Sequence, residues 1–193
     1  STKEVEGSTA PRGRILDRNG KVIVDNKAVK TIYYQKEKGR TALDEINLAY
    51  KVAPHLNLSI SKLNDRMKRE FFVAKNSEKM KKRIKVSEYE KVKQRKLTQD
   101  DILELKIERV TDDELNSFTD EDKKAAYLYY LMNKGYTYDQ KVIRTKDVTD
   151  EEYAYIAENN KSLDGFNTRL DWERSYPYGD VFRTILGTVS DNG

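Results

Sequence analysis

A recurrent helix-start signal constrains the fold of this chain more than any other feature of the sequence. A hydroxyl residue followed three positions later by an acid can cap a helix, because the hydroxyl accepts a hydrogen bond from a free N–H of the first turn. An acid at that position also suits the helix dipole. The pattern occurs six times, at Thr41/Asp44, Ser87/Glu90, Thr98/Asp101, Thr111/Glu114, Thr119/Asp122 and Thr149/Glu152. The middle of the chain is therefore predicted to form many short helices, one of which spans Asp120–Lys134 and ends at Gly135.

The two ends of the chain have the pattern of β-strands. Asn19-Gly20 separates two short apolar runs, which predicts a hairpin with a type I′ turn. Further strands are predicted at Val29–Tyr34, Gln140–Thr145 and Gly165–Trp172, with a helix at 150–158 and a short apolar segment at 181–186. We therefore expect an α+β fold in one domain over 1–193. In it, both chain ends (about 1–35 and 140–193) form a small β-rich base, and about 41–135 form a large, mostly helical head.

Composition excludes several classes of protein. The 193 residues are 37% hydrophobic and 36% charged, with 13 Tyr and 5 Phe, which is polar for a globular domain but sufficient for a core. The absence of cysteine excludes disulfide scaffolds, thiol catalysis and cysteine-based zinc sites. No apolar run approaches the roughly 20 residues of a membrane-spanning helix. The single histidine, His55, has no clustered partner, so we expect it to be structural and predict no metal site and no cofactor.

Charge is distributed in two adjacent blocks of opposite sign. Residues 59–97 hold 14 basic and 5 acidic residues, a net of +9, and residues 98–123 hold 3 basic and 10 acidic residues, a net of −7. The blocks can neutralise each other across a helical hairpin. The alternative is a helical binding module for polyanionic partners, with Lys81, Lys82 and Arg83 as candidate contacts to an anionic surface. No nucleic-acid-binding motif accompanies the basic block, so nucleic acid is not expected as a partner.

Two stretches imitate the motifs of a serine acyltransferase. Ser59-Ile60-Ser61-Lys62 matches S-x-x-K and Ser190-Asp191-Asn192 matches S-D-N, but no K-T-G follows them. Ser59 or Ser61 is better explained as the cap of the helix that carries Leu63, Met67 and Phe71. We therefore predict no catalytic residue in this chain.

The two end segments resemble the motifs that open and close the non-catalytic N-terminal domain of class B penicillin-binding proteins. The opening segment Ala10–Gly20 (APRGRILDRNG) fits R-G-x-I-x-D-R-x-G, and Arg174–Gly179 (RSYPYG) with the later Ile185-Leu186-Gly187 fits R-x-Y-P-x-G…L-G. Residues 146–152 and 163–166 fit the helix and strand between them. Asp164, Phe182–Thr184 and Ser190 depart from the common pattern and suggest a Gram-positive subgroup. The motif residues named as a structural or interdomain site are Arg12, Gly13, Asp17, Arg18, Asn19, Gly20, Arg174, Tyr176, Pro177, Gly179 and Gly187.

The residues of these motifs suggest how the ends are joined. Gly13 is expected to allow a close approach of the backbone to a neighbour. Arg12, Arg18, Asp17 and Arg174 can form an ion-pair cluster between the chain ends. Such a cluster holds the base together, forms the seam with a following catalytic domain, or does both.

The resemblance also implies a biological setting. It implies an extracytoplasmic pedestal of a parent that builds the bacterial cell wall, anchored in the membrane by a helix before Ser1. A serine D,D-transpeptidase domain that cross-links peptidoglycan and is acylated by penicillin would follow Gly193. The implied partners are that transpeptidase domain, a polytopic membrane glycosyltransferase and other divisome or elongasome proteins, with a homodimer as a further option.

Overall fold

The computed structural model describes residues 11–178. The predicted segment at 181–186, the predicted site residues Gly179 and Gly187, and the S-D-N match lie outside this range. The elements follow one another as β1 (Ile15–Leu16), β2 (Val22–Tyr34), α1 (Ala42–Val52), η1 (Ala53–His55), η2 (Ile60–Lys62), α2 (Asp65–Lys75), α3 (Ser77–Lys81), α4 (Val86–Lys93), α5 (Gln99–Glu108), α6 (Asp112–Asn116), α7 (Asp120–Asn133), β3 (Lys141–Arg144), α8 (Asp150–Asn159) and β4 (Phe166–Ser175).

A small antiparallel sheet is built around β2. Over Asp25–Tyr34 this strand pairs with the whole of β4, and its ends pair with β1 and β3. The strand predicted at Val29–Tyr34 is therefore the second half of one 13-residue strand. The sequence did not predict the full length of this strand, because Asp25, Asn26 and Lys27 interrupt its apolar pattern. These three residues are extended because they pair with β4.

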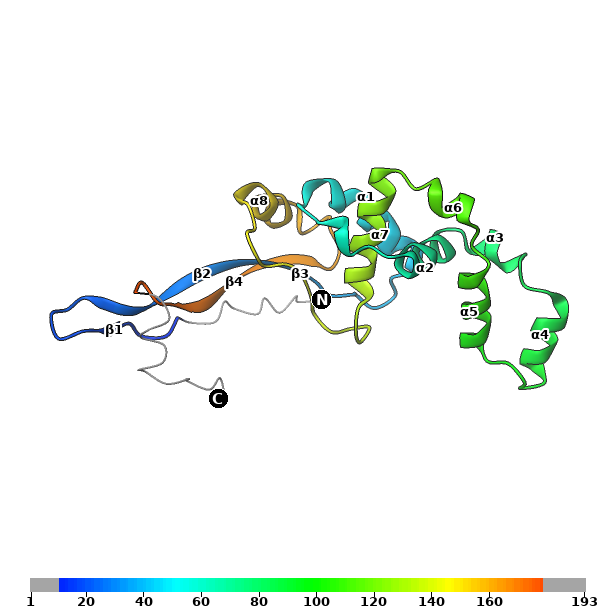
Figure 1. Cartoon of the computed structure of the whole chain (residues 1–193), viewed down its shortest axis with the longest axis horizontal. Helices are drawn as coiled ribbons and strands as arrows, with labels where there is room; N and C mark the ends of the chain where they lie inside the picture. Colours follow the sequence, from blue (N-terminus) through cyan, green and yellow to red (C-terminus); the bar gives the residue numbers. More distant parts are fainter. Residues whose placement is uncertain (1–10, 179–193) are drawn as a thin grey trace.

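The molecule is elongated (Figure 1). The β2–β4 ribbon and the β1 hairpin form one end, and α3, α4 and α5 form the other. Helices α1, α7 and α8 lie beside the sheet. The described fold combines a small sheet, made by segments near both ends of the chain, with a helical middle. The predicted α+β class is thereby confirmed.

Two hydrophobic clusters support the helices. The main core packs α1, α2, α7 and α8 against the sheet through buried side chains such as Tyr34, Ile46, Phe71 and Leu128. A smaller cluster of Val73, Met80, Ile107, Val110 and Leu115 joins α2, α3, α5 and α6. Helix α4 has no buried residue, so polar contacts attach it to the rest of the head.

The helix starts follow the capping signals closely. Five of the six predicted boxes form, at Thr41, Thr98, Thr111, Thr119 and Thr149. The box predicted at Ser87 is wrong, because α4 begins at Val86 and Glu88 accepts a hydrogen bond from the Lys85 N–H (2.9 Å). Neither Ser59 nor Ser61 caps α2, because Asn64 accepts from the Met67 N–H (2.9 Å).

Helix α7 ends close to the predicted residue, but Lys134 already has an extended backbone (φ −67°, ψ +131°), so the helix stops before Gly135. Its last residue is Asn133, and Gly135 takes φ +79° two residues later. Among the helices of residues 11–178, none is both long and apolar enough to cross a membrane.

Candidate functional site

The opening motif forms the hairpin between β1 and β2. The Asp17 N–H donates to the Lys21 carbonyl (2.8 Å) and the Gly20 N–H donates to the Asp17 carbonyl (3.0 Å). Gly20 has φ +79°, but in residues 11–178 the non-glycine residues with positive φ are Arg95 and Asp147. Asn19 thus lacks the positive φ of a type I′ turn. The predicted turn type is wrong, and the loop is a type I turn followed by a glycine bulge.

Asp17 selects this turn. One oxygen of its carboxylate accepts hydrogen bonds from the backbone N–H groups of Asn19 (2.9 Å) and Lys21 (2.9 Å). An aspartate that bonds the backbone two residues ahead stabilises such a turn. Asp17 therefore holds its own hairpin. The ion-pair cluster of Asp17 with Arg12, Arg18 and Arg174 stays a prediction. Arg18 is an exposed residue of the same turn.

The opening and closing motifs meet beside β2. Arg174 Nη1 donates to the Gly13 carbonyl (2.7 Å), a residue 161 positions earlier in the chain. The same nitrogen reaches Asn26 Oδ1 at 3.4 Å, and Asn26 Nδ2 donates to the Arg12 carbonyl. Arg174 therefore joins the chain ends through a backbone carbonyl. A Cβ atom built on Gly13 would meet no heavy atom within 4 Å in the described structure, which does not support the close approach predicted there.

The closing motif continues toward the hairpin turn. Tyr176 and Pro177 follow β4 directly, and Lys21 Nζ lies 4.4 Å from the centre of the Tyr178 ring. A cation above an aromatic face is attracted by the ring quadrupole. The β2–β4 ribbon with the β1 hairpin, which we call the arm, thus carries a second link between the two motifs.

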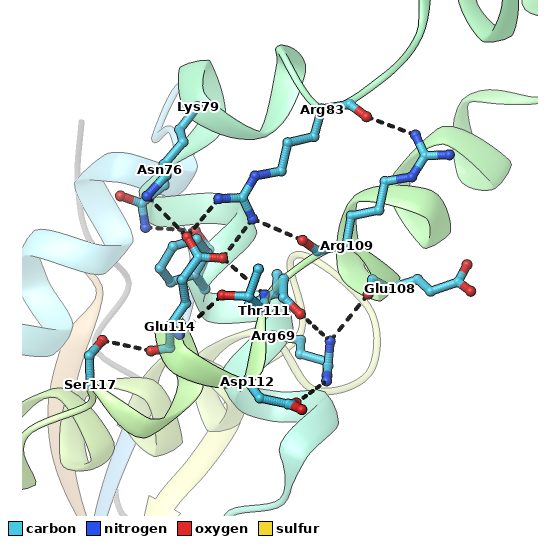
Figure 2. Close-up of polar contacts among 12 residues, drawn as sticks. Arg69, Asn76, Lys79, Arg83, Glu108, Arg109, Thr111, Asp112, Glu114 and Ser117 are labelled. Carbon is cyan, nitrogen blue, oxygen red and sulfur yellow. Dashed lines mark hydrogen bonds and ion pairs between the residues drawn. The ribbon is translucent and has the colours of Figure 1, made fainter.

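The head is fastened by a reciprocal arginine clasp, which we define as Arg83, Arg109, Glu88 and Glu114. Figure 2 shows Arg83, Arg109 and Glu114. Arg83 donates to both oxygens of Glu114 (2.6 and 2.7 Å) and to the Arg109 carbonyl (2.8 Å). Arg109 donates to both oxygens of Glu88 (2.7 and 2.8 Å) and to the Arg83 carbonyl (2.8 Å). Bidentate pairs of this kind are geometrically specific. The clasp ties α4 and the segment after α3 to α6 and to Arg109, the residue that follows α5.

Both glutamates are held as carboxylates. Hydrogen bonds from Arg83, together with those from Thr111 and Lys79, keep the pKa of Glu114 far below its usual range. Hydrogen bonds from Arg109 and from the Lys85 N–H lower the pKa of Glu88 to about 2. The clasp is therefore fully charged at neutral pH.

These pairs answer the question raised by the two charge blocks. Arg66 binds both oxygens of Glu104 (2.6 and 2.8 Å), and Arg83 binds Glu114, so the basic block is paired with the acidic block. Arg83, predicted as a contact to an anionic surface, has its guanidinium committed within the head. Lys81 pairs with Glu78 (3.0 Å) and Lys82 is exposed. The structure gives no support to the polyanion-binding alternative.

A buried carboxylate joins the head to the sheet. Glu152 of α8 is 1% exposed and accepts from Arg144 of β3 through Nε (2.9 Å) and Nη2 (3.2 Å). It also accepts from the backbone N–H groups of Asn57 (2.7 Å) and Thr149 (2.8 Å). Burial alone would raise the pKa of Glu152, but these hydrogen bonds hold it below its usual value. The sequence had identified Glu152 only as a helix cap, because its partners lie on other elements.

The remaining sequence candidates, two serines and a histidine, contact other side chains of the domain. The hydroxyls of Ser59 and Ser61 lie 2.9 Å apart and are hydrogen-bonded to each other. His55 stacks on Tyr155, with ring centres 3.7 Å apart. No group of metal-ligating side chains that could hold an ion occurs in the portion of the chain that is described.

The fold is thus an elongated α+β domain. Side-chain hydrogen bonds of Arg174, Arg83 and Arg144 join its β-strands and helices to other segments of the chain. A sequence profile described as "Penicillin-binding Protein dimerisation domain" matches residues 7–192. The chain belongs to this family, as the end motifs had indicated. It corresponds to the non-catalytic dimerisation domain of class B penicillin-binding proteins.

Individual relatives agree with the family assignment. Penicillin-binding protein 2A of Bacillus subtilis is 34% identical over 185 residues, covering 96% of this chain and 26% of that protein. Penicillin-binding protein 2B of Streptococcus pneumoniae is 25% identical over 185 residues, covering 95% of this chain and 27% of that protein. The solved structure of penicillin-binding protein 2B from S. pneumoniae strain R6 has the same fold (TM-score 0.66, 22% identity, 92% of this chain and 27% of that chain). The chain thus spans about a quarter of the length of these relatives.

Proposed function

We propose that this chain is the extracytoplasmic pedestal of a membrane-anchored peptidoglycan D,D-transpeptidase that acts in bacterial cell wall synthesis. In this proposal, a membrane helix precedes Ser1 and the catalytic serine domain follows Gly193. The observation that supports it most strongly is that relatives match nearly all of this chain with only about a quarter of their own length. The remaining length is sufficient for an anchor and a catalytic domain.

The arrangement of the motifs supports a positioning role. Arg174 bonds to Gly13 beside β2, so the segments that enter and leave the described domain lie together on the arm. Helices α3, α4 and α5 lie at the far end (Figure 1). We assign residues 1–35 and 140–193 to the base that orients the catalytic domain, and residues 41–135 to the head that contacts partners.

The partners proposed for this domain are its own C-terminal transpeptidase domain, a polytopic membrane glycosyltransferase and other divisome or elongasome proteins. The description of the family as a dimerisation domain also supports a homodimer of the parent. The motif residues Arg12, Gly13, Asp17, Arg18, Asn19, Gly20, Arg174, Tyr176, Pro177, Gly179 and Gly187 would form the seam with the catalytic domain.

A labelling experiment tests the parent directly. Antiserum raised against this chain is used on membranes of the source cells after treatment with fluorescent penicillin. We expect a membrane-bound polypeptide much larger than 193 residues that carries the label, whereas the isolated chain remains unlabelled. Excess unlabelled penicillin should abolish the signal. A small, unlabelled polypeptide outside the membrane fraction would refute the proposal.

A further inference from the structure

Strand β4 leaves one edge of the sheet open, in a ribbon that extends beyond the helices (Figure 1). It pairs with β2 along one side, and no strand of residues 11–178 pairs with its other side. The pairing with β2 has none of the register shifts that interrupt β1 and β3. Natural proteins protect an exposed edge by shortening the strand, bulging it, or placing proline or lysine in it. Strand β4 has ten residues and contains neither proline nor lysine.

The hydrogen-bond pattern shows which backbone groups face the open edge. The Gln35 N–H donates to the Gly165 carbonyl (2.9 Å), which continues the register of β2 and β4. Bonded and non-bonded pairs alternate in an antiparallel ladder, so the odd-numbered residues of β4 bond to β2 and the even-numbered ones direct N–H and C=O outward. The Thr168 N–H agrees with this pattern, because it donates to the side chain of Asn167 (3.0 Å) instead of to β2. Strand β4 therefore presents a row of pairing groups along its outer side.

The side chains around Leu170 are complementary to a second copy of themselves. Arg169 and Asp171 flank Leu170, are partly exposed and carry opposite charges. When two copies of the strand pair antiparallel about Leu170, Arg169 of each copy lies opposite Asp171 of the other. Thr168 then lies opposite Trp172, which is 37% exposed. A β-branched residue opposite an aromatic one is a favourable cross-strand pair.

Other registers place like charges opposite each other. Even-numbered residues must face even-numbered ones, so the two-fold axis passes through a residue. Several centres bring a charged residue opposite its own copy, namely Arg169, Asp171, Glu173 and Arg174. A centre at Trp172 brings Asp171 opposite Glu173. Like charges directly opposite each other are destabilising, and among the centres from 169 to 174 only Leu170 avoids them.

We propose that two copies of this domain pair through the outer edges of β4, antiparallel and with Leu170 of one copy opposite Leu170 of the other. The same surface then serves both copies, as two-fold symmetry requires. Arg169 Nε already holds Oδ2 of its own Asp171 (3.0 Å), so the four charged side chains form an alternating ring across the axis. This inference rests on the homodimer proposed for the parent and names the surface and the register that form it.

Covalent trapping tests this pairing, because the chain has no cysteine of its own. In Leu170→Cys the two introduced residues lie directly opposite each other, with Cα atoms about 5.5 Å apart, which is within the range of a disulfide. In the control Glu173→Cys they lie six positions apart along the paired strands, or about 20 Å. Glu173 is the more exposed residue, so random collisions favour the control.

The two variants of the 193-residue chain are oxidised with diamide at neutral pH, and dimers are followed on a non-reducing gel. Strand pairing over a few residues forms a small interface, so the trap is chosen because it also detects a short-lived dimer. We expect Leu170→Cys to form its disulfide at least about tenfold faster than Glu173→Cys. Equal rates, or no disulfide from Leu170→Cys, would show that β4 does not pair in this way.

A proline variant tests the backbone bonds. Added to Leu170→Cys, Trp172→Pro removes an outward N–H without removing a bond to β2, and it should slow the disulfide at least about tenfold. Trp172→Thr keeps that N–H and should change the rate less than about fivefold. A proline variant that reacts as fast as the threonine variant would contradict pairing through the backbone.

A mixture of two chains covers the case in which Leu170→Cys fails to fold. Thr168→Cys and Trp172→Cys lie opposite each other in the same register, so the mixed disulfide should form faster than the disulfide of either chain alone. The result is separable from penicillin labelling. A labelled parent whose domain forms no such disulfide leaves the pedestal proposal standing and overturns the pairing, and an unlabelled parent whose domain forms it does the reverse.

Discussion

The buried carboxylate of Glu152 provides the most stringent test of how α8 is attached to the sheet. Replacing Glu152 with alanine removes the acceptor of four hydrogen bonds, two from Arg144 and two from backbone N–H groups. The Arg144 side chain is only 18% exposed, so it would keep its charge in a poorly hydrated position. Removing one partner of a buried ion pair typically costs about 3–5 kcal/mol.

The expected cost lies at the lower end of that range. Arg144 Nη2 also donates to the Asp147 carbonyl (3.2 Å), and the remaining exposure lets water reach the guanidinium. We therefore expect Glu152→Ala to lower the free energy of unfolding by about 3 kcal/mol. Glu152→Gln preserves the shape and one acceptor, so a loss of about 1–2 kcal/mol is expected. Domains of this size are stable by roughly 5–15 kcal/mol, so both variants should fold.

Urea unfolding at neutral pH measures these differences. The matched control is Glu151→Gln, which removes the same charge from the neighbouring, exposed position and should change stability by less than about 0.5 kcal/mol. If Glu152→Ala costs no more than this control, Glu152 does not join α8 to the sheet and the reasoning fails.

The same residue predicts a pH dependence. The pKa of Glu152 in the folded protein lies below its ordinary value of 4.5. Its contribution is therefore fully present above pH 4.5 and is lost as the pH falls through the folded-state pKa. The stability difference between the natural chain and Glu152→Gln should be constant from pH 7 to pH 5 and shrink below pH 4.5. A difference that grows on acidification would contradict the assignment.

Three further substitutions test single backbone or side-chain features. Gly165 has φ +94°, and a Cβ atom there would lie 2.5 Å from the Gln35 carbonyl oxygen. Gly165→Ala should therefore lower the free energy of unfolding, measured in urea, by about 3 kcal/mol or more. The control Gly39→Ala should cost about 1 kcal/mol, because Gly39 has φ +83° but no atom within 4 Å of such a Cβ. Arg95, which follows α4, has φ +58°, a backbone conformation that glycine adopts more easily than arginine. Arg95→Gly should therefore raise the free energy of unfolding by up to about 1 kcal/mol, seen as a higher melting temperature. A lower melting temperature would show that the contacts of the arginine side chain outweigh the strain of its backbone. Lys141→Met should stabilise the domain by about 1–3 kcal/mol by removing an unpaired buried ammonium, and a loss of stability would reveal an internal partner.

Local interactions explain why the sequence predicted much of the fold. In the capping boxes of Thr41 and Thr98, donor and acceptor are three residues apart, so the same few residues that carry the signal also complete the interaction. Such features depend little on the path of the rest of the chain, and they were predicted at the correct residues.

Local signals failed where another residue competed for the same role. Asn19-Gly20 predicted a type I′ turn, but the carboxylate of Asp17 bonds two N–H groups of the loop and favours a type I turn with a bulge. Ser59 and Ser61 were eligible caps for α2, but Asn64 stands nearer to the helix start. The alternation pattern of β2 was interrupted by polar residues that pair with β4.

The sequence by itself determined the α+β class, most helix starts, the hairpin position and the family, because each depends on short motifs. Its charge pattern allowed two adjacent blocks of opposite sign to neutralise each other, but left a surface for polyanionic partners open as the alternative. Only the tertiary structure decided which residues pair: Arg83 with Glu114 across 31 positions, and Arg174 with Gly13 across 161. It also left Lys141 Nζ without a hydrogen-bond partner among residues 11–178. These contacts depend on the path of the whole chain through space, which a local sequence pattern does not specify.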